Sequence, residues 1–428
     1  MPEKKPTGVR WVVLAILFIA TTNNYLDRIM LTILSPVILD DLHFSEQEFG
    51  YINSVFQFTY AFGFLGMGKI IDSWGTRAGY SIAIAFWSVA AGLHALARNV
   101  VDLGFWRGLL GLGESGNFPA GIKAVCEWFP KKDRALATSL FNSGTNIASV
   151  CGPPVFVWMN LHFGWRACFL ITASTGIICL MLWWWLYRVP RQHSWANEAE
   201  IALIESDVEE KQQVEIGYMQ ALRTRQTYGF GLAKFFSDPV WWFYLTWLAL
   251  YFKRVRGLSL QEIGWAIPVI YFTASFGSVL GGWLSGFLIR LGWSSGKARK
   301  VTMAIFALCM PVAATAVAVD SVVLAVALIS LACAAHQGWS ANLYTTVSDV
   351  FPKSAVASVT GIGGALGGLG GAIFTGILPG YIITHFGYAP VFMMMGSFHI
   401  LAFACLHVFM GRIERISVQP LVVTGKRE

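Results

Sequence analysis

The sequence predicts an all-α membrane protein of twelve transmembrane helices, arranged as two pseudo-symmetric six-helix halves. The first reason is composition: 55% of the 428 residues are apolar and 13% are charged. The mean hydropathy is +0.57, and values of this kind are typical of polytopic membrane proteins. The second reason is that long apolar segments recur along the whole chain, and the third is an internal repeat.

The apolar segments are separated by glycine, proline and charged residues, and most are long enough to cross a bilayer. An even number of crossings leaves both termini on the same side of the membrane. We expect twelve spans, at 11–39, 46–67, 79–97, 101–128, 134–160, 166–187, 239–252, 260–289, 301–319, 321–348, 355–384 and 389–410.

The internal repeat consists of two short motifs that occur once in each half. Phe-Pro-Lys at 129–131 is followed by His-Phe-Gly at 162–164, and Phe-Pro-Lys at 351–353 is followed by His-Phe-Gly at 385–387. The two copies have the same orientation. Parallel repeats of this kind indicate two six-helix halves related by an axis along the membrane normal.

The repeat and the polar centre of the chain divide it into four parts. We expect an N-terminal bundle at 1–187, a cytoplasmic linker at 188–237, a C-terminal bundle at 238–411 and a cytoplasmic tail at 412–428. With the termini inside, 23 of the 31 Lys and Arg residues fall on the cytoplasmic side, five outside and three within spans. Cytoplasmic loops carry such an excess. We therefore predict a multi-pass protein of the cell inner membrane with both termini cytoplasmic, and the net charge of +7 does not imply nucleic-acid binding.

Charged residues fall deep inside two predicted spans: Asp27 and Arg28 in the first, and Arg107 and Glu114 in the fourth. A charge at that depth costs about 3 kcal/mol or more, so it faces a protein interior or a wet cavity. In the functional interpretation, Arg28 holds an anion while Asp27 and Glu114 handle protons. In the structural alternative, these groups neutralise one another permanently, with Glu114 paired to Arg107 or Arg28.

Polar and aromatic residues in two other spans are candidates for contacts to a neutral part of a ligand. Tyr60 lies in the second span, where an ordinary helix–helix hydrogen bond is the alternative. The tenth span carries His336, Gln337, Trp339 and Asn342 near mid-depth. Such a cluster suits a sugar, because an aromatic face can cover C–H groups and amides can bind hydroxyls.

No cofactor is predicted. The seven cysteines lie in or beside apolar spans without short paired spacing, which argues against disulfides and zinc.

The loop between the second and third spans contains Gly68, Asp72, Gly75 and Arg77. It resembles the signature loop of the major facilitator superfamily, where such residues latch the two halves together.

Several further motifs together resemble the anion:cation symporter family of that superfamily, and most of all its hexuronate branch. They are Tyr25-Leu-Asp27-Arg28, Arg107…Glu114, Asn117-Phe-Pro119, Glu127-Trp-Phe-Pro130-Lys, Ala335-His336-Gln337 and Val359-Thr-Gly-Ile-Gly-Gly364. The family includes hexuronate, galactonate and glucarate transporters and sialin-like carriers.

The resemblance implies the major facilitator fold and inward symport of a sugar acid with protons, by a monomer within the lipid bilayer and without enzymatic activity. It implies that Arg28 binds the carboxylate and that Asp27 and Glu114 are the proton-handling pair. The substrate-binding set we expect comprises Tyr25, Arg28, Tyr60, Arg107, Asn117, Asn146, His336, Gln337, Trp339 and Asn342.

Two other functions compete. An organic-anion or organophosphate exchanger of the same superfamily would need basic residues from both halves, whereas Arg28, Arg107 and Lys123, the basic residues within predicted spans, all belong to the first. A membrane enzyme would need a catalytic motif, and the sequence shows no His-Glu-x-x-His or nucleophile motif. A sensor would have no need of the six-plus-six repeat.

Overall fold

The computed structural model describes residues 5–206, 220, 222–351 and 353–416. Within these residues the secondary structure is helical, without strands. Eight helical stretches are long and apolar enough to cross a membrane, and one of them, Leu136–Leu186, has 51 residues. A helix of that length extends roughly 75 Å, enough for two crossings.

The described helices of the N-terminal half cover the six spans predicted there. Their elements are α1 (Val9–Ile33) with α2 (Ser35–Leu42), α3 (Glu46–Leu93), η1 (His94–Leu96), α4 (Val100–Glu114) with α5 (Asn117–Trp128), and α6 (Lys131–Leu186). Two of these helices each contain two spans, because a glycine with positive φ interrupts them: Gly75 in α3 (φ 79°) and Gly164 in α6 (φ 78°). Only glycine adopts that conformation without strain.

The described helices of the C-terminal half likewise cover the six spans predicted there. Its elements are α9 (Arg225–Arg254), α10 (Leu260–Arg290), α11 (Ser295–Cys309) with α12 (Val312–Thr315), α13 (Val322–Val350), α14 (Lys353–Gly371) with the π-helical η3 (Ala372–Ile377) and α15 (Leu378–Phe386), and α16 (Tyr388–Cys405) with η4 (Leu406–Met410). The fold class predicted from the sequence is confirmed. The helix α9 begins at Arg225, within the stretch predicted as linker, 188–237.

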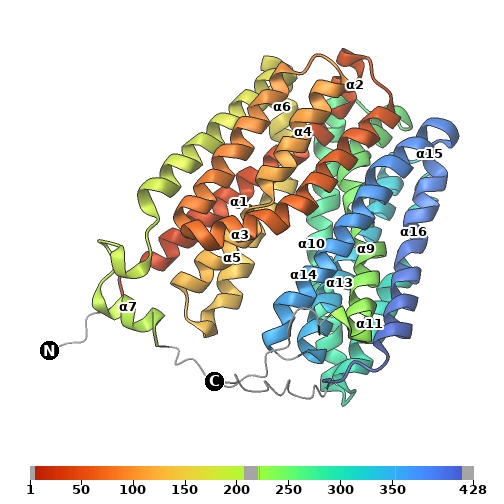
Figure 1. Cartoon of the computed structure of the whole chain (residues 1–428). Coiled ribbons are helices and arrows are strands. Elements are labelled where there is room, and N and C mark those ends of the chain that lie inside the picture. Colours follow the sequence, from red (N-terminus) through yellow and green to blue (C-terminus); the bar gives the residue numbers. More distant parts are fainter. Residues whose placement is uncertain (1–4, 207–219, 221, 352, 417–428) are drawn as a thin grey trace, which may run out of the picture.

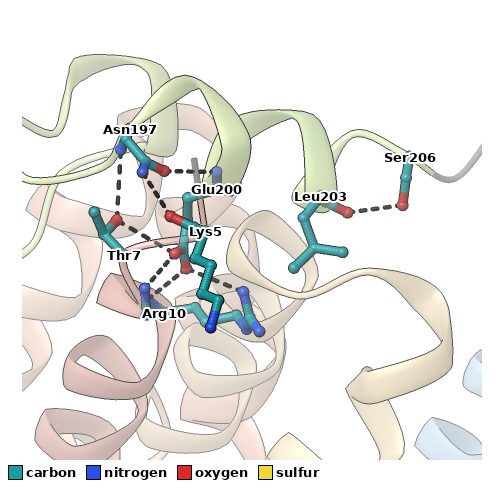
Figure 2. A network of polar contacts seen from close by, with 8 residues as sticks. Lys5, Thr7, Arg10, Asn197, Glu200, Leu203 and Ser206 are labelled. Atoms are coloured by element: carbon teal, nitrogen blue, oxygen red, sulfur yellow. Dashed lines mark hydrogen bonds and ion pairs between the residues drawn. The ribbon is translucent and has the colours of Figure 1, made fainter. Parts of the chain in front are cut away.

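The described part of the linker packs against the start of α1. It contains η2 (Pro190–Gln192) and α7 (Glu198–Ile204). The buried carboxylate of Glu200 accepts hydrogen bonds from the backbone of Gly8 and from the Arg10 side chain, the latter at 3.2 Å (Figure 2). Asn197 caps α7 and donates to the Lys5 carbonyl at 2.8 Å. These bonds fix α7 to the N-terminal half.

The two halves contact each other at the end of the molecule that carries α2 and α15, opposite α7 (Figure 1). Ser54 of α3 donates to the Ala372 carbonyl at 2.8 Å and accepts from the Ile377 N–H at 2.8 Å. Arg254 of α9 lies 2.7 Å from Asp40 and 3.8 Å from Glu46. In the predicted topology this end is external, and toward α5 and α14 the helices of the two halves diverge (Figure 1). In that predicted topology the arrangement is inward-facing.

The Arg254 contacts generate the first prediction. Arg254→Ala should change the free energy of unfolding by less than about 1 kcal/mol, because exposed ion pairs contribute little. It should nevertheless increase the population with an open external end, because the Asp40 and Glu46 contacts exist only where the halves meet. Spin labels at Leu96 and Phe386, both exposed at that end, should report a larger long-distance fraction in a background without other reactive cysteines.

The matched control is Arg166→Ala. Arg166 pairs with Asp41 at 3.0 Å within the N-terminal half, so its loss should leave the distance distribution unchanged. Equal distributions in the parent protein and the Arg254 variant would contradict the role assigned to Arg254.

Candidate functional site

A buried ion pair joins α1 to α4 in the N-terminal half. Arg28 Nε lies 2.8 Å from Glu114 Oε2, and the side chain of Glu114 is 0% exposed whereas that of Arg28 is 15% exposed. Glu114 is the last residue of α4, where the span breaks before α5 begins at Asn117. Of the partners considered from sequence, the pairing is therefore with Arg28, and the guanidinium is the more accessible of the two groups.

Three aromatic rings surround the Arg28 guanidinium. Its central carbon lies 5.4 Å from the ring centre of Tyr25, 4.5 Å from that of Tyr60 and 5.1 Å from that of Phe56. Cation–π contacts at these distances stabilise a cation in a low-dielectric site. Close approach of α4 depends on Gly111, because a Cβ there would lie 2.6 Å from the Phe56 carbonyl oxygen.

Arg107 and Asn117 support this arrangement from inside the bundle. Arg107 is 1% exposed and donates through Nη2 to the Arg28 carbonyl at 2.7 Å. Asn117, also 1% exposed, accepts from the Tyr80 hydroxyl at 2.6 Å and from Thr21 at 3.3 Å. Arg107 Nε and Nη1 and Asn117 Nδ2 have no hydrogen-bond partner among the described residues, and the contact of both residues with substrate stays a prediction.

Asp27 faces the interior of the N-terminal bundle. It is 1% exposed and accepts a hydrogen bond from Asn23 at 3.0 Å. Asp27 Oδ1 and Glu114 Oε1 are both buried without a hydrogen-bond partner among the described residues. Buried polar atoms are normally satisfied, so each oxygen has the capacity for a proton or a water molecule.

The C-terminal half contributes Trp241 of α9, which the sequence interpretation missed. Its indole stacks on His336 with ring centres 5.5 Å apart and an interplanar angle of 12°. His336 is 5% exposed, and its Nδ1 lies 3.1 Å from Nε2 of His399 on α16. In this structure His336 therefore positions the Trp241 ring.

Trp339 and Asn342 belong to the packing of the C-terminal half in this structure, and their contact with substrate stays a prediction. Trp339 is 0% exposed and packs edge-on against His399. Asn342 is 1% exposed and donates to the carbonyls of Gly281 at 2.9 Å and Gly338 at 3.0 Å. Both side chains point into the bundle, because α13 turns that face toward α10, α11 and α16.

Two other predicted residues are more accessible. Gln337 is half-buried and has no hydrogen-bond partner among the described residues. Asn146 of α6 is exposed. It is eleven residues from Val157, about 20° away around the helix at 100° per residue, and a Cβ on Gly264 of the other half would lie 2.9 Å from Val157. Asn146 therefore lies on the face of α6 that is turned toward the C-terminal half.

The predicted latch between the halves is not engaged through Arg77. Its guanidinium lies 4.2 Å from the Trp184 ring centre and donates to the Trp184 carbonyl at 2.5 Å, within one half. Gly75 forms the turn, and Gly68 has open space around its Cα. The side chain of Asp72 lies outside the part of the chain that the structure describes.

A buried basic residue also occurs in the C-terminal half, which corrects a premise of the sequence argument. Lys234 is 2% exposed inside α9, in a stretch expected to be linker. Its Nζ lies 2.7 Å from Asp238 Oδ2 and 2.7 Å from the Tyr344 hydroxyl. Basic residues inside the bundle are therefore not confined to the N-terminal half.

The packing role of Asn342 generates a second prediction. Asn342→Leu should lower the free energy of unfolding by about 1–3 kcal/mol, because the bonds to two carbonyls are lost and an amide site is replaced by a branched apolar group. Thermal melting of the purified protein measures this effect. Gln337→Leu on the same helix is the control and should change the melting temperature little. A melting temperature of Asn342→Leu equal to that of the parent protein would contradict the packing role.

Comparisons with known proteins agree with the fold. The family described as Major Facilitator Superfamily matches residues 17–375. The chain is 30% identical to the hexuronate transporter of Escherichia coli over 93% of each protein, and 27% identical to a D-galactonate transporter of Escherichia coli over 96% of this chain and 98% of that protein. The crystal structure of a bacterial homologue of the human lysosomal transporter Spinster, inward-facing and unoccupied, matches with a TM-score of 0.72 at 20% identity, covering 94% and 95% of the two chains. The chain belongs to the Major Facilitator Superfamily, a family of membrane transporters and not of enzymes.

Proposed function

We propose that this protein is a proton-coupled symporter that imports a sugar acid, a hexuronate or a closely related anion, by alternating access. The sugar-acid names of its relatives support the substrate class. The observation that carries the proposal is the partly exposed Arg28 guanidinium, bracketed by aromatic rings and paired with a single buried carboxylate. In this proposal the protein acts as a monomer in the inner membrane with both termini cytoplasmic, and protons are its coupling ions.

The coupling follows from competition for Arg28. When Glu114 is ionised, Arg28 is already neutralised at 2.8 Å, and a second carboxylate beside it would be repelled. Protonation of Glu114 removes that negative charge and leaves the guanidinium fork available for the substrate carboxylate. Binding of the proton and of the anion therefore favour each other, and thermodynamic linkage makes this effect reciprocal.

The neutral part of the sugar acid would meet aromatic and amide groups. The rings of Tyr25, Tyr60 and Trp241 can cover C–H faces, and Gln337 and Asn146 can bind hydroxyl groups. A site that hydrogen-bonds a hydroxyl discriminates strongly against analogues that lack it. Recognition of the carboxylate is thereby assigned to the N-terminal half. Discrimination among epimers is assigned to Gln337 of the C-terminal half together with Asn146 of the N-terminal half.

An exchanger of organic anions or organophosphates is the second candidate, and Lys234 is the observation in its favour. A dianionic substrate would bind more strongly if both halves supplied a cation. Lys234 is neutralised by Asp238 at 2.7 Å, however, and Glu114 adds a further carboxylate beside Arg28. We therefore propose a monoanion symported with protons.

Uptake into proteoliposomes separates these functions. Radiolabelled glucuronate or galacturonate should accumulate when the outside is acidic, and a protonophore should abolish accumulation. An exchanger would instead require an internal counter-anion such as inorganic phosphate and would be insensitive to the protonophore.

Arg28→Lys gives the third prediction. It should weaken sugar-acid binding at least about tenfold, because a planar two-donor fork is replaced by a point charge. Equilibrium binding to the purified protein measures this loss, and the corresponding neutral aldose should bind poorly to both proteins. Undiminished sugar-acid binding by Arg28→Ala would remove Arg28 from the site.

Glu114→Gln gives the fourth prediction. Glutamine mimics the protonated carboxyl, so the variant should still bind the sugar acid and exchange labelled for unlabelled substrate. It should lose accumulation driven by the pH gradient, because an ion biases two states only through differential binding. Asp27→Asn should share this behaviour if the two carboxyls act as a pair, and intact uphill uptake by Glu114→Gln would contradict the proposed coupling.

A further inference from the structure

The cluster of Lys234, Asp238 and Tyr344 lies apart from the Arg28 site. Lys234 Nζ contacts Asp238 Oδ2 and the Tyr344 hydroxyl, each at 2.7 Å. The ammonium also lies 4.4 Å from the Tyr344 ring centre. An ammonium has three N–H donors, and the described contacts use two of them.

The packing around the cluster makes room for charged groups. A Cβ on Gly363 of α14 would lie 3.0 Å from Lys234 Cδ, and a Cβ on Gly367 would collide with the Asp238 carboxylate. Desolvation of two charges can exceed their mutual attraction, so two apolar side chains would pack here at lower cost. Ionisable groups inside membrane proteins mark substrate or ion pathways by default.

The position of the cluster points to a pathway. Lys234 is seven residues before Trp241 on α9, two turns away on the same face and about 10 Å nearer the cytoplasmic end. A Cβ on Gly368 would lie 3.4 Å from Ala61 of α3, so the halves still meet at this level. In the cluster itself, Tyr344 is 47% exposed and the Asp238 side chain is 17% exposed.

We propose that Lys234 and Tyr344 form a second, transient binding station for the carboxylate of the departing substrate, between Arg28 and the cytoplasm. The proposal rests on the function proposed above. As the anion leaves the central site, it accepts one hydrogen bond from the third N–H of the Lys234 ammonium and another from the Tyr344 hydroxyl. Asp238 keeps the net charge of the station near zero, so the anion is bound weakly and is released.

The same charge balance predicts opposite effects for the two members of the ion pair. Without Lys234, the anion finds no cation after leaving Arg28, and the station repels it through Asp238. Without the Asp238 charge, the Lys234 cation is uncompensated and holds the anion too strongly. If the ion pair is purely structural, loss of either residue lowers the stability of the protein equally. The two variants then do not change the affinity for the anion in opposite directions.

The test uses right-side-out proteoliposomes and labelled glucuronate, with uptake and efflux measured separately. Lys234→Met should raise the KM for efflux at least about fivefold and change the KM for uptake less than about twofold. Asp238→Asn should lower the efflux KM and slow maximal efflux. Tyr344→Phe keeps the ion pair and removes one donor, so it should raise the efflux KM by a smaller factor and remains informative if a charge variant fails to fold.

Lys297→Met is the matched control, because Lys297 lies on the C-terminal half over the Trp293 ring at 4.5 Å, outside the cluster. Efflux and uptake should both match the parent protein. The station would be overturned if the cluster variants changed the KM for efflux and the KM for uptake by the same factor and in the same direction. It would also be overturned if neither KM changed. A parent protein that carries glucuronate while the variants do not differ from it overturns the station alone, whereas a parent protein that carries no sugar acid overturns the proposed function and the station with it.

Discussion

The Arg28 guanidinium has two competing anionic partners, the Glu114 carboxylate and the carboxylate of the proposed substrate. The rest of the proposed mechanism depends on this competition. Arg28 is held by Glu114 at 2.8 Å in a site from which water is largely excluded. Inside a bilayer an uncompensated charge is costly, so Arg28 requires one carboxylate at a time, and two ionised carboxylates beside it would leave excess negative charge. The proposed coupling requires no conformational signal beyond this competition.

The helices around the pair hold its geometry while leaving one side accessible. Arg107 donates to the Arg28 carbonyl and thereby fixes α1 against α4. The break between α4 and α5 places Glu114 at a helix end. Contacts such as Ser54 with Ala372 join the two halves at the end that the predicted topology places outside. Lys234 lies on the proposed route from Arg28 to the cytoplasm and would give the departing anion an intermediate partner.

The sequence was sufficient for the fold and for the charged residues of the site, because both follow from bilayer energetics. Charges at 27, 28, 107 and 114 stand out against apolar spans, and the repeat defines the halves. Contacts between aromatic rings produce no comparable pattern in the sequence of an apolar span, so Phe56, Trp241 and His399 were missed. Of these, Phe56 could have been found, because it lies one helical turn before Tyr60. Lys234 was missed because the polar beginning of α9 resembles a linker. The burial of Trp339 and Asn342 in the C-terminal half could not be predicted, because an apolar helix gives no sign of which face meets the other half.

The central claim is that anion binding at Arg28 releases Glu114 for protonation. Calorimetric titration of glucuronate into the purified protein, near neutral pH and in two buffers of different ionisation enthalpy, measures the protons exchanged on binding. The account predicts uptake of about one proton per anion bound, and loss of that uptake in Glu114→Gln while binding is retained. Binding enthalpies that are identical in both buffers for the parent protein would contradict it.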